Sequence, residues 1–172
     1  MKIFLTLKQR NRLIKNIKIL KKELDIKISL NGTLLEFTGD SLKEYDSGIV
    51  LDAVAQGFSV KNALLLKNPD YIIEKVELKN YLRPQRLRQI KARIIGKEGK
   101  AIKTLKQLSD CDIKIDDYSV CILGLFEDVK LAKQAVLRLI RGSKHSYVYD
   151  KLEHKQLFDE DDLGLKIEKR QF

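Results

Sequence analysis

The sequence predicts an α+β protein of two tandem domains, each a three-stranded sheet packed by helices. The main observation is an internal repeat, because Leu24-Asp-Ile-Lys-Ile28 recurs as Cys111-Asp-Ile-Lys-Ile115. Each copy continues through a turn into a second strand, a glycine and a helical stretch. The chain has 172 residues, 44% of them hydrophobic, which suffices for two small cores.

The second copy shows a complete order of elements. Proline suits the first turn of a helix, and Pro84 stands where such a helix would begin. Apolar residues recur at helical spacing from Val129 to Ile140, and Gly142 follows as a helix stop. We therefore predict a strand at 71–78, helices from 84 to 93 or 95 and at 100–108, strands at 111–115 and 119–123, and a helix at 127–141.

The first copy keeps this framework but is shorter before its hairpin. After a strand at 2–7, the apolar residues Ile14, Ile17, Leu20 and Leu24 indicate a single amphipathic helix. No glycine occurs between Met1 and Asn31, so the first copy lacks the turn at 96–99 of the second.

A hairpin and further helices are predicted after that helix. Asn31-Gly32 is a strong two-residue hairpin signal before a strand at 33–37. Helices follow within 41–58 and 60–66. The predicted domains are therefore residues 1–69 and 70–155, with an acidic tail at 156–172 that is either disordered or packed on a partner.

Positive charge is concentrated in the second copy. The whole chain carries 34 Lys and Arg against 24 Asp and Glu, a net charge of +10. Residues 79–106 contain ten basic side chains and one acidic one, Glu98, a net charge of +9. Clustered charge of this kind favours a polyanionic partner. No apolar run is long enough to span a bilayer, and no signal peptide is evident.

The centre of this basic region is the turn Gly96-Lys97-Glu98-Gly99, preceded by Ile94-Ile95. Glycine at both ends lets a sugar–phosphate backbone approach closely, because no Cβ atom holds it away. A helix that starts at Lys100 directs its free N–H groups at the same point. Lys97, Lys100 and Lys103 add cations, and the isoleucines offer an apolar floor for a base. Single-stranded nucleic acid fits this combination better than a small molecule.

This order of elements, with Arg93-Ile-Ile-Gly-Lys-Glu-Gly-Lys100, resembles a type I KH domain, an RNA-binding module whose GXXG loop clamps about four nucleotides. The segments Val54-Ala-Gln-Gly-Phe-Ser, Ala63-Leu-Leu-Leu and Ile140-Arg-Gly-Ser-Lys-His-Ser-Tyr-Val-Tyr149 resemble the "partner of Nob" family of KH proteins of small-subunit assembly. The first domain is then a degenerate KH-like domain without a GXXG loop.

The resemblance implies a cytoplasmic or, in a eukaryote, nuclear or nucleolar assembly factor that is not an enzyme and needs no cofactor or metal. Its expected partners are the 3′ region of small-subunit precursor rRNA and the PIN-domain endonuclease that matures this end, and a monomer is expected. Ile95 and Ile102 are the favoured base contacts. The expected RNA-binding residues are Arg93, Ile94, Ile95, Gly96, Lys97, Glu98, Gly99, Lys100, Ile102, Lys103, Ile113 and Ile115.

Two other functions stay open. The first domain and the tail would also suit a protein adaptor that docks a nuclease or ribosomal protein, with RNA contact secondary. An RNA-processing enzyme is disfavoured, because no nucleophile–histidine–carboxylate order stands out. His145 is expected to cap the last helix or to pack beside Tyr149, and contact with an unstacked RNA base is the less favoured alternative. Cys111 and Cys121 are expected to be reduced thiols.

Overall fold

The structure, a computed structural model, describes residues 1–80 and 84–155. The chain divides between Ile73 and Glu74 into two compact units, which are described separately. The predicted acidic tail at 156–172 lies outside the described residues.

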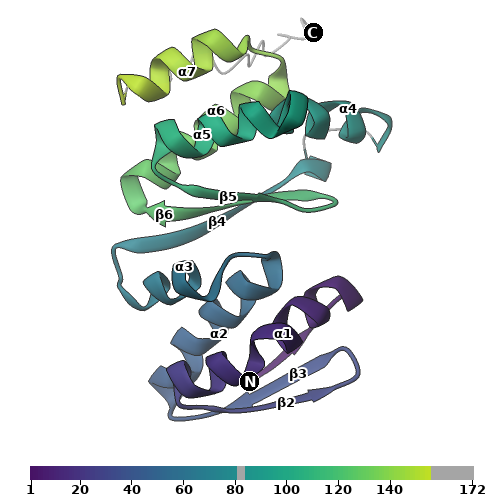
Figure 1. Cartoon of the computed structure of the whole chain (residues 1–172), viewed down its shortest axis with the longest axis vertical. Coiled ribbons are helices and arrows are strands. Elements are labelled where there is room, and N and C mark those ends of the chain that lie inside the picture. Colours follow the sequence, from purple (N-terminus) through teal and green to yellow (C-terminus); the bar gives the residue numbers. More distant parts are fainter. Residues whose placement is uncertain (81–83, 156–172) are drawn as a thin grey trace, which may run out of the picture. The chain divides into compact units, whose positions relative to one another are not determined.

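The second unit has the strand–helix–helix–strand–strand–helix order that the sequence predicts. Its sheet has the strand order β4–β6–β5, with β5 and β6 antiparallel, so β5 is an edge strand (Figure 1). A further helix, α7, closes the unit and was not predicted. The elements are β4 (Tyr71–Glu77), α4 (Pro84–Ile95), α5 (Lys100–Ser109), β5 (Asp112–Ile115), β6 (Ser119–Leu125), α6 (Phe126–Arg141) and α7 (His145–Glu153).

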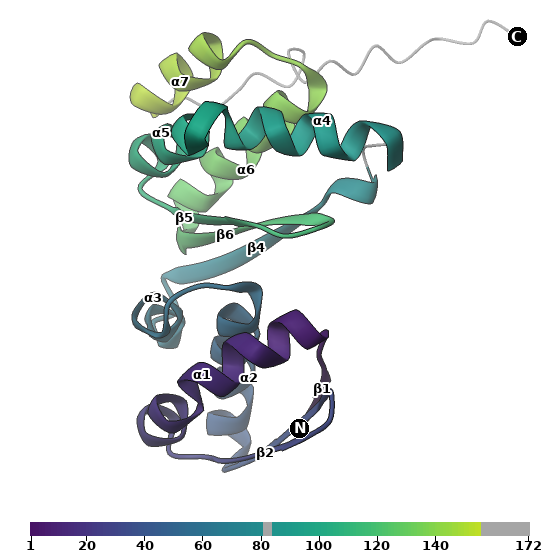
Figure 2. The same ribbon diagram turned by 45° about the vertical axis from the view of Figure 1, so that its right-hand side comes forward.

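Helices cover one face of this sheet. Figure 2 shows α4, α5 and α6 over the strands, with α7 beyond them. The core between these layers contains the buried side chains of Leu105, Ile122 and Leu139. Helix α7 packs on α5 and α6 and buries Val148 and Leu152. Both cysteines are buried and neither forms a disulfide, and burial raises the pKa of the Cys111 thiol to about 12.

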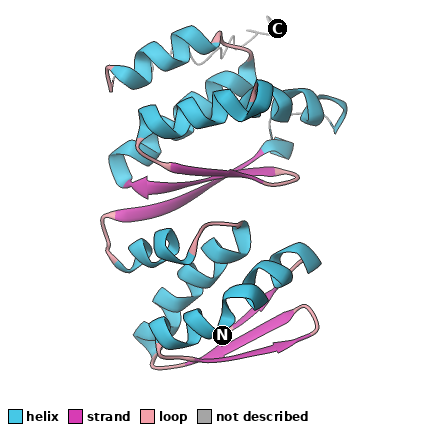
Figure 3. Ribbon diagram, in the orientation of Figure 1, coloured by secondary structure: helices cyan, strands magenta, loops and turns pink. Residues whose placement is uncertain are grey.

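The first unit repeats the same plan with one long helix before its hairpin. Its sheet has the order β1–β3–β2, and its helices again pack on the strands (Figure 3). Thr6 begins α1 with a capping box, because its hydroxyl accepts from the Gln9 N–H while the Gln9 side chain accepts from the Thr6 N–H. The elements are β1 (Lys2–Phe4), α1 (Leu7–Leu24), β2 (Lys27–Asn31), β3 (Leu34–Thr38), α2 (Ser41–Gln56) and α3 (Val60–Leu64).

The single amphipathic helix predicted here is confirmed, but its buried face differs from the prediction. Leu13, Leu20 and Leu24 are buried, whereas Ile14 is 41% exposed. Leu13 and Ile14 are adjacent apolar residues, so they point in different directions and only one can face the sheet. The hairpin prediction also needs a shift of one residue. Asn31 pairs with Leu34 in the ladder, so the two loop residues are Gly32 and Thr33.

The internal repeat is real, but its register is two residues away from the one that the sequence suggests. Asp25 and Asp110 both adopt a left-handed conformation at the ends of α1 and α5, with φ of 50° and 53°. A Cβ atom added to Gly39 would lie 3.0 Å from Ile26, and one added to Gly124 would lie 2.8 Å from Cys111. Ile26 therefore corresponds to Cys111, not to Ile113, and a glycine is needed opposite each.

The repeat also extends beyond the predicted helices. Gly57 and Gly142 end α2 and α6 in the left-handed region, with φ of 105° and 104°. In each unit another helix begins three residues later, α3 at Val60 and α7 at His145. Helix α7 is thus the longer counterpart of α3.

Candidate nucleic-acid interface

The glycine turn connects α4 to α5 in a conformation that requires glycine at its first position. Gly96 has φ of 75° and ψ of 175°, a combination that is essentially restricted to glycine. A Cβ atom there would lie 2.5 Å from the Ala101 Cβ and 2.8 Å from its backbone nitrogen. Gly99 also has positive φ, at 73°, but a Cβ atom there would meet nothing within 4 Å. The backbone at Gly96 therefore lies directly against the start of α5.

The surface of the turn suits an anion. Gly99 precedes α5 without a side-chain capping bond, so the positive end of this helix is open at the turn. Lys97, Lys100 and Lys103 are exposed around it. The Lys100 ammonium lies 3.7 Å from the Glu98 carboxylate, and both side chains are largely exposed, so this pair holds the lysine weakly. The lysine can therefore exchange its partner for a phosphate.

The predicted isoleucines divide into surface and core residues. Ile94 and Ile113 are 0% and 1% exposed, so they belong to the core and offer no face to a ligand. Ile95 is 36% exposed, and Ile102 and Ile115 are half-buried. Of the pair before the turn, only Ile95 can contact a base directly, because adjacent positions on a helix face different directions.

A groove of about 590 Å³ lies beside the turn, between α4 and the loop that joins β5 to β6. Leu87, Lys91 and Ile95 follow each other at intervals of four on α4 and face Tyr118 of the loop; Arg88, Ala92 and Asp117 complete the lining. Ile102, Ile113 and Ile115 are not part of this lining. The groove residues Leu87, Arg88 and Tyr118 were not predicted, although the four-residue spacing along α4 would have revealed the first of these.

Two lysine contacts hold the loop between β5 and β6 in place at the edge of the groove. The Lys91 ammonium donates to the Asp117 carbonyl at 3.3 Å. The Lys79 ammonium lies 4.0 Å from the centroid of the Tyr118 ring, a cation–π distance. The aromatic ring is therefore fixed at the groove edge, and it is 51% exposed.

Arg93, predicted as an RNA contact, is engaged within the protein. Its guanidinium donates to the carbonyls of Gly142 and Ser143 at 3.1 and 2.6 Å. These carbonyls follow the end of α6, which a cation stabilises. His145 packs beside Tyr149, as one of its predicted roles states, and the centroids of the two rings are 5.8 Å apart.

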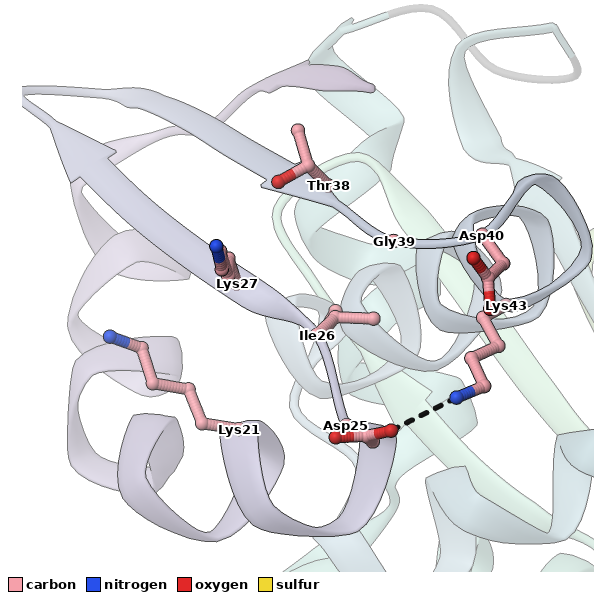
Figure 4. A pocket seen from close by; sticks show the side chains of 8 residues that line it. All are labelled: Lys21, Asp25, Ile26, Lys27, Thr38, Gly39, Asp40 and Lys43. Carbon is pink, nitrogen blue, oxygen red and sulfur yellow. Dashed lines mark hydrogen bonds and ion pairs between the residues drawn. The ribbon is translucent and has the colours of Figure 1, made fainter.

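The first unit also contains a polar pocket, shown in Figure 4. Lys21, Lys27 and Lys43 line it, but so do Asp25 and Asp40. The Lys43 ammonium donates to the Asp25 carboxylate at 2.9 Å, which lowers the pKa of that carboxyl. Since this lysine already has an anionic partner and another aspartate lies nearby, the pocket suits a polyanion less well than the turn at Gly96.

Residues 1–80 and 84–155 contain no candidate metal site and no candidate membrane-spanning helix. No group of three or more His, Cys, Asp and Glu side chains there is arranged to hold a metal ion. None of the helices in those ranges combines the length and apolar character needed to cross a membrane.

Comparisons with known proteins match the second unit to a KH domain. Residues 72–157 match a family model described as a eukaryotic-type KH domain (KH domain type I), the second such domain of PNO1 proteins. The chain is 30% identical over 146 residues to a KH domain-containing protein of Methanocaldococcus jannaschii, covering 81% of this chain and 64% of the relative. It is 31% identical over 154 residues to the pre-rRNA-processing protein PNO1 of Coccidioides immitis, covering 88% of this chain and 58% of that one.

The fold is shared with a solved archaeal structure. Dim2p of Pyrococcus horikoshii, in a complex with a/eIF2alpha and rRNA, superposes with a TM-score of 0.80 at 24% identity, over 90% of this chain and 92% of that one. The chain thus spans less than two thirds of the length of the two curated relatives but most of this structure.

Proposed function

Because the chain belongs to the PNO1 family of KH-domain proteins, we propose that it binds single-stranded RNA and assists maturation of small-subunit rRNA near its 3′ end. The observation that carries this proposal is the basic glycine turn of the second unit beside an apolar groove. The names of the relatives support it, since one is a pre-rRNA-processing protein and another was solved with rRNA.

Phosphates and bases would be held by different parts of the second unit. The phosphates would bind at the turn Gly96–Gly99 and the start of α5, beside Lys97, Lys100 and Lys103. The release of counterions from the RNA would provide affinity. The groove takes the bases against Ile95 and Tyr118, where unstacked bases can be recognised. Ile94 and Ile113 are buried and support the turn without touching RNA.

The first unit would act as a supporting or protein-docking domain and would not clamp RNA. Its helix α1 runs without a break through the place where the second unit has its turn. We therefore propose that residues 1–69 are a degenerate KH-like domain and that residues 70–155 form the RNA-binding one. The protein would act as an assembly factor that presents the RNA to a processing nuclease, without chemistry of its own.

Crosslinking the full chain to cellular RNA and sequencing the bound fragments tests the proposed substrate. Crosslinks should accumulate near the 3′ end of small-subunit rRNA and its precursor. Crosslinks spread over messenger RNA or over the large-subunit rRNA would reject the assignment to small-subunit maturation.

Replacing Ile95 with aspartate should weaken binding of single-stranded RNA about tenfold, because a carboxylate would line the groove where a base and its phosphates approach. Ile95 is already 36% exposed, so the free energy of unfolding should change little. Fluorescence anisotropy with a labelled oligonucleotide measures the affinity. Leu125→Asp is the matched control, since Leu125 is 42% exposed in the same unit, and it should bind RNA normally.

An adaptor role is the second candidate, and exposed apolar side chains of the first unit favour it. Phe4 and Leu7, at the end of β1 and the start of α1, are 81% and 69% exposed. Exchanging both for serine should reduce capture of the PIN-domain endonuclease and leave RNA affinity unchanged. If the same exchange lowered RNA affinity and left nuclease capture intact, the first unit would be an RNA-binding unit instead.

A further inference from the structure

Helix α7 contacts both flanks of the glycine turn. Before the turn, His145 Nε2 donates to the Arg93 carbonyl at 3.1 Å, while Arg93 in turn donates to the segment that leads into α7. After the turn, the Tyr149 hydroxyl lies 3.5 Å from the Ala101 carbonyl. Val148 and Leu152 anchor the helix with exposures of 0% and 1%. The position of α7 is therefore tied to the position of the turn.

A second pocket, of about 320 Å³, lies between α7 and the turn. It is separate from the groove on α4, because the two linings share no residue. Pockets that hold small ligands begin at about 300 Å³. The lining is Gly96, Lys97, Lys100, Ala101, Thr104, His145 and Tyr149.

The composition of this pocket suits a nucleotide. Lys97 and Lys100 stand on the side of the turn, and the half-buried rings of His145 and Tyr149 stand on the side of α7. The rings meet edge to face at an interplanar angle of 60°, so they are fixed against one another. Burial raises the pKa of the Tyr149 hydroxyl, which therefore stays neutral beside an anionic backbone. Unstacked RNA bases bind by stacking on tyrosine and histidine, with cations at their phosphates.

We propose that this pocket is an additional nucleotide subsite, which holds the base next to the phosphates at the glycine turn against Tyr149 and His145. A single strand would then run from the groove on α4, over the turn, and onto α7. This proposal rests on the proposed RNA-binding function and extends it. With the subsite, the protein would contact a longer stretch of single-stranded RNA than the groove alone accommodates.

The test compares short and long RNA on the full chain. KH grooves take about four nucleotides, so a randomised tetramer fills the groove and a randomised heptamer reaches the subsite. Tyr149→Leu keeps an apolar side chain but removes the ring. It should weaken heptamer binding about tenfold and change tetramer binding less than about twofold, because stacking contributes to one added base only. Tyr149→Phe should bind both RNAs as the unaltered chain does.

A neighbouring tyrosine provides the matched control. Tyr147 lies on the same helix but outside the pocket, so Tyr147→Leu should leave heptamer binding unchanged. A heptamer carrying 2-aminopurine provides a second readout, since the probe should be quenched on stacking in the unaltered chain, in Tyr147→Leu and in Tyr149→Phe, but not in Tyr149→Leu.

The outcomes separate this subsite from the clamp itself. If Tyr149→Leu leaves heptamer affinity and 2-aminopurine quenching unchanged, the subsite proposal is wrong. The RNA clamp at the glycine turn would still be supported in that case, provided that altering Lys97 and Glu98 abolishes RNA binding. An equal loss for tetramer and heptamer in Tyr149→Leu would also overturn it, because the ring would then act only by positioning the turn. Failure of the unaltered chain to bind either RNA would contradict the proposed function.

Discussion

Replacing Lys97 and Glu98 together with aspartate should weaken binding of single-stranded RNA by about 100-fold or more, equivalent to ~2.7 kcal/mol. The change adds a second carboxylate at the tip of the turn, where position 98 already has one, and removes one of the cations around it. Repulsion then replaces attraction at the point where the phosphates come closest. Both side chains are exposed, so the fold should be retained. Anisotropy titration with labelled RNA measures the loss, and circular dichroism checks the fold.

The matched control is the same pair of exchanges on α6, Lys130→Asp with Glu127→Asp. Both residues are exposed in the same unit, and the net charge changes by the same amount. If binding is local to the turn, this control should lose only the small part that comes from the total charge. Equal losses in the two variants would mean that RNA binds through the overall positive charge and not through the glycine turn.

Gly96→Ala should destabilise the second unit by about 3 kcal/mol or more, whereas Gly99→Ala should cost about 1 kcal/mol. At Gly96 the added methyl group would strain a backbone conformation that is essentially restricted to glycine, and it would also clash with the backbone of Ala101. At Gly99 the only cost is that of a positive φ for alanine, since the added Cβ atom would have no atom within 4 Å. RNA affinity should fall in the first variant even where it remains folded, because the turn has to move away from the start of α5.

The two cysteines provide a probe of stability that is specific to the second unit. Cys111 and Cys121 are the only cysteines in the chain, and both are buried there. Alkylation in increasing urea therefore reports the unfolding of this unit alone. Similar midpoints for the two glycine variants would show that contact with Ala101 does not constrain the turn.

The sequence was sufficient for the order of elements because each element carries a local signal. Pro84 marks the start of α4, Gly142 marks the end of α6, and the absence of glycine before Asn31 indicates one continuous helix in the first unit. These signals act within a few residues, where propensity and capping decide the structure.

Features that depend on tertiary packing were missed or misplaced. The repeated letters Asp-Ile-Lys-Ile suggest one register, but the packing of Gly39 on Ile26 and of Gly124 on Cys111 defines another. Ile94 and Ile95 are adjacent, identical residues, and only the structure shows that Ile94 is buried and Ile95 exposed.

Helix α7 was missed for a related reason. It is short, and its stability comes from burying Val148 and Leu152 on α5 and α6, not from a strong periodic pattern. Its contribution to the site therefore depends on the contacts of Arg93, His145 and Tyr149, which only the fold brings together.

The most direct test of the central claim is to map which peptides of the full chain crosslink to a bound single-stranded RNA under ultraviolet light. We expect crosslinks at the turn and groove, within residues 87–104 and 117–118, and at residues 145–149 of α7. Crosslinks confined to residues 1–73 would contradict it, because the RNA clamp would then lie in the unit that has no glycine turn.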